Sequence, residues 1–145
     1  MKLPKEITNG FLIFLGIGIY FLLMNVLGLA DLFYLRVLNV FFIFYGVNRT
    51  MQMNIHEGET NFVSNAVSAM TTSVVGVCMS VFGLLVYSYA RGGDAYVKTL
   101  SETFLFGGNP SVPTCCICLL FEGIASSVIV TLMMMLYWNN KLAAD

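Results

Sequence analysis

The sequence predicts an all-α fold: a four-helix transmembrane bundle with a short interfacial helix between the third and fourth spans. Hydrophobic residues make up 58% of the 145 residues and charged residues only 10%, a composition too apolar for an ordinary soluble domain. The apolar residues form four runs, each near the roughly 20 residues that a helix needs to cross a bilayer core. Because only short segments join these runs, we expect residues 1–145 to form a single four-span membrane domain.

The first two spans are predicted to pack as an antiparallel pair. The first covers Thr8–Leu27, and the turn Gly28–Asp31 is so short that the second span, Leu32–Met51, must return beside it. The first apolar run is longer than the core of a signal peptide, so we expect it to be retained as a span. Polar residues crowd the next segment, Arg49–Asn61, which is predicted to be a solvated loop.

The second half of the chain contains two further spans, Phe62–Tyr89 and Thr114–Trp138. Between them, Asp94 is expected to cap a short interfacial helix, in which apolar residues recur at helical spacing. These apolar residues are Tyr96, Val97, Leu100 and Phe104. The segment Gly107–Pro113 is predicted to be irregular because it combines two glycines with two prolines.

The distribution of lysine and arginine predicts the orientation of the spans, because cytoplasmic loops are enriched in these residues. There are slightly more on the side of the termini, so both termini are expected to be cytoplasmic. Lys2, Lys5, Arg49 and Lys141 fall on that side, and Arg36, Arg91 and Lys98 on the other. The net charge of −1 and the absence of a basic cluster in the sequence argue against a nucleic-acid partner.

Small residues recur at every fourth position of the third span and form one ridge along a helix face. In lipid, such ridges let two helix backbones approach closely. The ridge can pack inside the protein's own bundle or form an interface with another subunit. Its members are Ser64, Ser68, Thr72, Gly76 and Ser80.

Glu122 is the leading candidate for a functional residue, because it lies about 10 Å into the fourth span by the helical rise, where a carboxylate is costly. Arg36 lies about 7 Å into the second span from the same side, and Asn39 is one turn further along. Ser126 lies one turn beyond Glu122, and Asn25 of the first span could join this cluster. Three interpretations remain open: an internal ion pair between Arg36 and Glu122, a proton or ligand site facing a wet cavity, and contact with a partner protein.

Cysteine and histidine give weak indications of chemistry. Cys115, Cys116 and Cys118 crowd the start of the fourth span, but the only histidine, His56, belongs to the opposite side of the membrane. A soft-metal site usually needs about four convergent ligands, so apolar packing of these cysteines is favoured over a metal site or a disulfide. His56, Glu57 and Glu59 match no metal or acid–base motif, so they are interpreted as a solvated turn. No cofactor, metal or catalytic residue is therefore predicted.

Several short motifs resemble those of uncharacterised small four-span bacterial membrane proteins. The similar segments are Phe44–Arg49, Glu57–Phe62, Phe106–Pro110 and Leu120–Gly123. This resemblance implies a multi-pass protein of the bacterial inner membrane with four helices, and it implies no activity.

Two functional hypotheses follow. The first is a non-enzymatic structural or accessory subunit, which associates with itself or with a larger membrane complex through the small-residue ridge. The alternative is a small transporter or a proton or ion relay that uses the intramembrane cluster of Arg36, Asn39 and Glu122. Beyond the lipid bilayer, the sequence identifies no partner.

Overall fold

The computed structural model describes residues 4–29, 35, 37–101 and 111–142. It confirms the predicted all-α class. The helices are α1 (Lys5–Val26), α3 (Asn39–His56), α4 (Phe62–Ala90), α5 (Asp94–Ser101) and α6 (Val112–Trp138), followed by the single 3-10 turn η1 (Asn139–Lys141).

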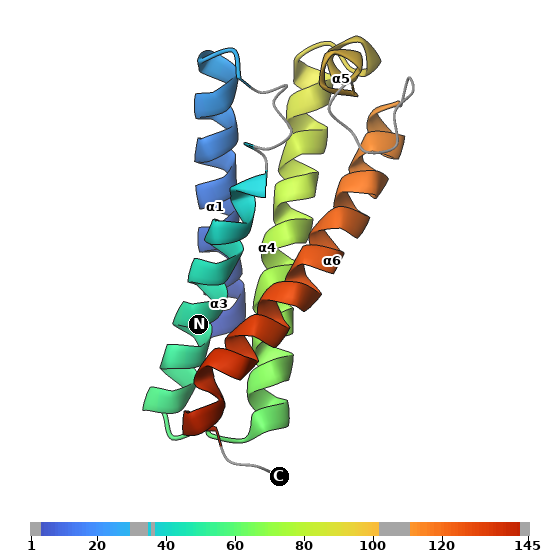
Figure 1. The fold of residues 1–145 in the computed structure, drawn as a ribbon. Helices are drawn as coiled ribbons and strands as arrows, with labels where there is room; N and C mark the ends of the chain where they lie inside the picture. The colour runs from blue at the N-terminus through green and yellow to red at the C-terminus, as the bar shows by residue number, and fades with distance from the viewer. Residues whose placement is uncertain (1–3, 30–34, 36, 102–110, 143–145) are drawn as a thin grey trace.

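The four long helices alternate in direction, and α4 contacts each of the other helices (Figure 1). The starts of α1 and α4 and the ends of α3 and α6 lie at one end of the bundle, which we call the terminal end. Lys5 pairs with Glu57 there, and the Trp138 indole donates to Asn48 Oδ1 at 3.0 Å, which joins α6 to α3. Helix α5 lies at the opposite end, which we call the α5 end.

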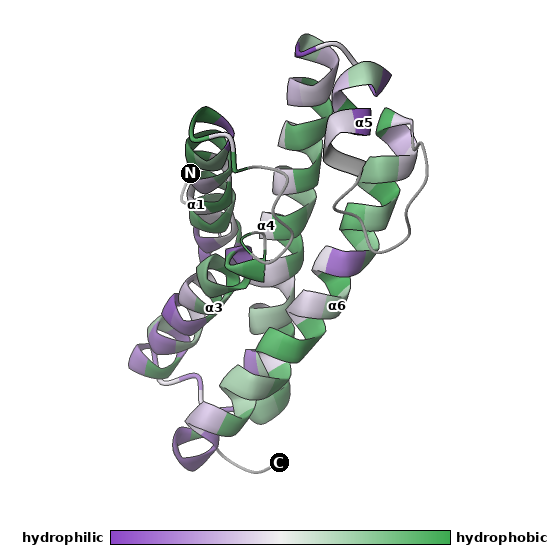
Figure 2. Ribbon diagram, turned by 45° about the horizontal axis from the view of Figure 1, so that its top comes forward, coloured by the Kyte–Doolittle hydropathy of each residue, from purple (hydrophilic) through white to green (hydrophobic). Residues whose placement is uncertain are grey.

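Three helices of the described chain are long and apolar enough to cross a membrane. They are Lys5–Val26, Phe62–Ala90 and Val112–Lys141. Helix α3 is more polar, and Figure 2 shows hydrophilic residues along it toward the terminal end, whereas α6 is mainly apolar. Three such helices are compatible with a multi-pass membrane protein.

The predicted loop over Arg49–Asn61 is wrong for its first part, because α3 continues as a helix to His56, whereas residues 57–61 do connect α3 to α4. The polar residues Thr50 and Asn54 of α3 are buried against the other helices, where side-chain hydrogen bonds compensate for their burial. Gly58 follows the C-terminal cap residue Glu57, and its φ of +85° places it in the left-handed region that glycine adopts without strain.

The other helix boundaries differ by smaller amounts. Helix α1 begins at Lys5, about one turn before the predicted start, and α4 ends one residue later than predicted. Helix α6 begins at Val112, so Pro113 belongs to its first turn rather than to an irregular segment. Proline is tolerated there because the first amides of a helix have no intrahelical acceptor. The predicted start of the second span lies in part outside the described residues.

Close helix contacts in the terminal half centre on Ile13 of α1. A Cβ added at Gly46 would lie 2.3 Å from Ile13 Cγ1, and one added at Gly76 would lie 2.7 Å from Ile13 Cβ. A Cβ added at Gly10 would lie 3.1 Å from the backbone oxygen of Thr72. Glycine is therefore required where α1 meets α3 and α4, because any side chain would separate the helices.

Helix α5 is tied to the start of α6. Asp94 Oδ1 accepts a hydrogen bond from the backbone N–H of Val112 at 2.9 Å, so this carboxylate satisfies an open amide of α6. Val97 of α5 is buried with Val112, Cys115 and Cys116 in a small apolar cluster. Two of the three crowded cysteines thus lie in apolar packing.

Candidate functional site

A partly open cavity of about 370 Å³ lies between α1, α3, α4 and α6 in the half of the bundle toward the α5 end. Its walls are mostly apolar. The larger apolar side chains that line it include Phe14, Ile17, Phe21, Val81, Leu84 and Leu119.

The shape of the cavity depends on small residues among these large ones. Gly18 lies on the wall, and a Cβ added there would meet no atom within 4 Å, so the space beside it is open. Gly83 also lines the cavity, but a Cβ there would lie 2.9 Å from the Phe14 ring. Phe14 thus packs on Gly83 at the cavity wall, whereas the space beside Gly18 is open.

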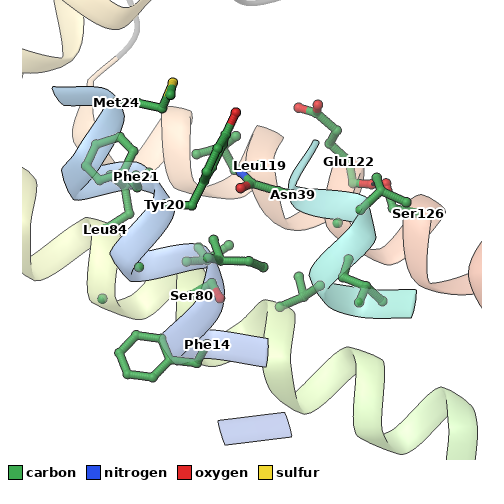
Figure 3. A pocket seen from close by; sticks show the side chains of 18 of the residues that line it. Phe14, Tyr20, Phe21, Met24, Asn39, Ser80, Leu84, Leu119, Glu122 and Ser126 are labelled. Carbon is green, nitrogen blue, oxygen red and sulfur yellow. Dashed lines mark hydrogen bonds between the residues drawn. The ribbon is translucent and has the colours of Figure 1, made fainter. Parts of the chain in front are cut away.

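Polar side chains on the cavity wall come from different helices (Figure 3). Tyr20 belongs to α1, Asn39 to α3, Ser80 to α4, and both Glu122 and Ser126 to α6. Asn39 Oδ1 is buried and accepts no hydrogen bond within the described part of the chain. A buried acceptor without a donor costs roughly 1 to 3 kcal/mol. A ligand that donates a hydrogen bond to this oxygen therefore gains the most binding free energy here.

The structure brings together part of the predicted intramembrane cluster. Asn39, Glu122 and Ser126 line the same cavity. Asn25 is not among the described lining residues, but its amide donates to the hydroxyl of Tyr87, which lines the cavity, at 2.6 Å. Arg36 lies outside the described residues, so its pairing with Glu122 stays a prediction.

Tyr87 connects three helices beside the cavity. Its hydroxyl accepts a hydrogen bond from Asn25 of α1, and its ring makes edge contacts with Phe21 of α1 and Tyr96 of α5. Burial raises the pKa of Tyr96 above its ordinary value, and the neighbouring Tyr87 raises it further. These contacts fix the α5 end of α1 against α4 and α5.

The small-residue ridge lies mainly against other helices of the same chain. Ser68 donates to Glu6 of α1 at 3.0 Å, Thr72 lies 2.9 Å from the Thr50 hydroxyl of α3, and Gly76 packs on Ile13. Ser80, the last member, lines the cavity. Ser64, the first member, donates its backbone N–H to Asn61 Oδ1, the cap of α4.

A buried polar network at the terminal end was missed by sequence reasoning. The Asn9 amide donates to Thr50 Oγ1 at 2.9 Å, and Thr50 in turn bonds Thr72, so one chain of hydrogen bonds joins α1, α3 and α4. Nearby, Asn54 donates to Asn65 Oδ1 at 3.1 Å. The four-residue spacing of Thr50 and Asn54 could have revealed one polar helix face, but their position in a supposed loop concealed it.

The remaining candidates lie away from the cavity. His56 and Glu57 are exposed at the end of α3, and Glu57 pairs with Lys5. Cys118 is half-buried on α6, and Cys78 is exposed on α4. None of these residues lines the cavity among its described walls.

Comparison with known proteins gives no family, curated relative or solved structure that matches this chain. The resemblance to small four-span bacterial membrane proteins therefore stays a prediction, and function must be argued from the geometry.

Proposed function

We propose that this chain is a non-enzymatic, multi-pass membrane protein that binds a membrane-soluble small molecule in the cavity between α1, α3, α4 and α6. One observation supports this most: polar side chains from four helices converge on a mostly apolar cavity of about 370 Å³. Ligand pockets commonly combine a volume of roughly 300 to 1,000 Å³ with apolar walls and a few polar groups that orient the ligand.

The proposal includes a four-span arrangement in the bacterial inner membrane with cytoplasmic termini. Helix α3 has 18 residues, which corresponds to about 27 Å by the helical rise and approaches the thickness of a bilayer core. It also runs beside α1 and α4, which are both apolar enough to span. In this arrangement the cavity lies in the leaflet farther from the termini, where a lipid-soluble molecule can enter without crossing water.

The geometry favours a binding role over the two hypotheses drawn from sequence. An accessory subunit was expected to dock through the small-residue ridge, but Ser68, Thr72 and Gly76 contact α1 and α3 of the same chain. A proton or ion relay requires a continuous row of polar groups, whereas Asn39 and Glu122 line a mostly apolar cavity. A docked partner or a relay remains the alternative if binding fails.

Photolabelling of the purified protein in lipid nanodiscs tests the proposal. A decane carrying a diazirine is activated by light, and the labelled peptides are identified by mass spectrometry. We expect the cavity-lining peptides of α1, α4 and α6 to be labelled. This labelling should saturate as the probe concentration rises, and excess unlabelled decane should prevent it. Labelling of lipid-facing residues is expected to rise in proportion to the probe concentration, without saturation.

Gly18→Leu provides the decisive variant, because Gly18 lines the cavity and a Cβ added there would meet no atom within 4 Å, so we expect the new side chain to fill part of this space. We expect it to abolish the saturable labelling and leave the proportional labelling unchanged. Val26→Leu is the matched control, since Val26 is 85% exposed on the same helix. The proposal fails if labelling never saturates, or if Gly18→Leu labels like the control.

A further inference from the structure

Three hydroxyl groups on the described cavity wall, those of Tyr20, Ser80 and Ser126, donate their hydrogens to the backbone. Tyr20 donates to the carbonyl oxygen of Leu35 at 2.8 Å, Ser80 to that of Gly76 at 2.7 Å, and Ser126 to that of Glu122 at 2.9 Å. A hydroxyl has a single hydrogen, so each of these oxygens can only accept a further bond.

Asn39 adds one more acceptor to the wall, because its Oδ1 receives no hydrogen bond among the described residues. Donors are fewer: the described wall offers the amide hydrogens of Asn39 and the hydroxyl of Tyr87, which lies beside Asn25 toward the α5 end. Among the described polar groups of the wall, the oxygens that can only accept therefore outnumber the donor groups.

An excess of acceptors discriminates between head groups. A ligand that brings an O–H can satisfy Asn39 Oδ1, whereas a ligand that brings only acceptors loses its own hydration and leaves that oxygen unpaired. A carboxylate ligand would also place its charge among acceptor oxygens in an apolar environment, which is unfavourable.

We infer that the cavity selects a single-chain lipid alcohol, a molecule with an apolar chain and a hydroxyl head that donates to Asn39. The apolar wall formed by Phe14, Phe21 and Leu84 receives the chain. This inference rests on the proposed function, because it names the class of molecule that the same cavity binds.

Competition against the photoreactive decane tests the inference with three ligands of equal chain length: decanol, decyl methyl ether and decanoate. Their concentrations are expressed as the measured amount within the nanodisc, so that partition into lipid does not affect the comparison. We expect decanol to prevent labelling at a roughly three- to tenfold lower concentration than the ether, the range that one net hydrogen bond supplies. Decanoate is expected to compete more weakly than decanol.

In the wild-type protein, we expect a higher concentration of the ether than of decanol to be needed to prevent labelling. Asn39→Leu should bring the ratio of these two concentrations close to one, because it removes the acceptor that distinguishes the two ligands. Gln52→Leu is the matched control, since Gln52 is exposed on the same helix, about 20 Å away by the helical rise, and should keep the wild-type ratio. Equal competition by ether and alcohol in the wild-type protein overturns the inference, even if Asn39→Leu fails to fold. In that case, saturable labelling by the photoreactive decane still supports the proposed function. If labelling does not saturate at all, both the proposed function and the inference about the lipid alcohol are contradicted.

Discussion

In the terminal half of the bundle, helices meet through glycine and hydroxyl side chains, whereas in the half toward the α5 end large side chains surround a cavity. Helix α4 belongs to both halves. Its Thr72 is fully buried and bonded to Thr50, but Ser80, two turns further on, lines open space.

This difference shows how one bundle can be rigid and hollow at the same time. Close backbone contact at Gly46 and Gly76, together with the hydrogen bonds of Asn9 and Thr50, sets the position of α1, α3 and α4. In lipid, association depends on such packing and bonding, because burial of apolar surface gives little drive. Toward the α5 end, close contacts occur at Gly83 and Gly123, but a Cβ added at Gly18 would meet no atom within 4 Å, and the cavity remains there.

Gly76→Leu is expected to have the largest effect on stability, because the added side chain must displace Ile13 at a contact where even a Cβ would lie 2.7 Å away. Overpacking of this kind costs about 1 to 3 kcal/mol. Thermal unfolding in mild detergent measures the loss. Gly18→Leu is the matched control, since it adds the same side chain at an open position and should leave the midpoint nearly unchanged. Equal losses in both variants would contradict the contrast between the halves.

Thr50→Val is expected to cost about 1 to 3 kcal/mol, because it leaves the buried Asn9 amide with only the weak sulfur acceptor of Met53 and breaks the link to Thr72. Thr8→Val, an exposed change on α1, serves as the control. The combined Asn9→Leu and Thr50→Val protein should lose less than the sum of the two single losses, since the first change removes the group that the second leaves unpaired. Strict additivity would mean that the network does not act as a unit.

Tyr87→Phe is expected to have the smallest effect, a loss of about 0.5 to 1.5 kcal/mol, because it removes the hydrogen bond from Asn25 but keeps the ring contacts with Phe21 and Tyr96. Hydrogen exchange locates the change. Amides near Asn25 should exchange faster, whereas amides around Thr50 should keep their wild-type rates. Faster exchange at both places would show that the two halves do not open independently.

The sequence predicts the helices well and the polar interior only in part. Apolar runs of suitable length identify α1, α4 and α6, and two members of the predicted cluster, Asn39 and Glu122, line one cavity, whereas the predicted pairing of Arg36 with Glu122 stays a prediction. Local polarity misleads for Thr50, because a polar segment can be a loop or the buried face of a helix, and only its tertiary partners Asn9 and Thr72 distinguish the two. The cavity itself depends on how four helices pack around Gly18, which no single segment determines.

The contrast between the halves is tested most directly by comparing Ser73→Cys with Ser80→Cys in a protein whose four native cysteines are replaced by alanine. The two serines are two turns apart on α4, and both donate to a carbonyl of their own helix. A small, membrane-permeant thiol reagent should modify position 80 readily, and decane should slow that reaction. Position 73, which is fully buried, should react only as fast as the bundle opens. Equal rates at the two positions, or a rate at position 80 that decane does not change, would contradict a packed terminal half joined to a ligand-binding cavity.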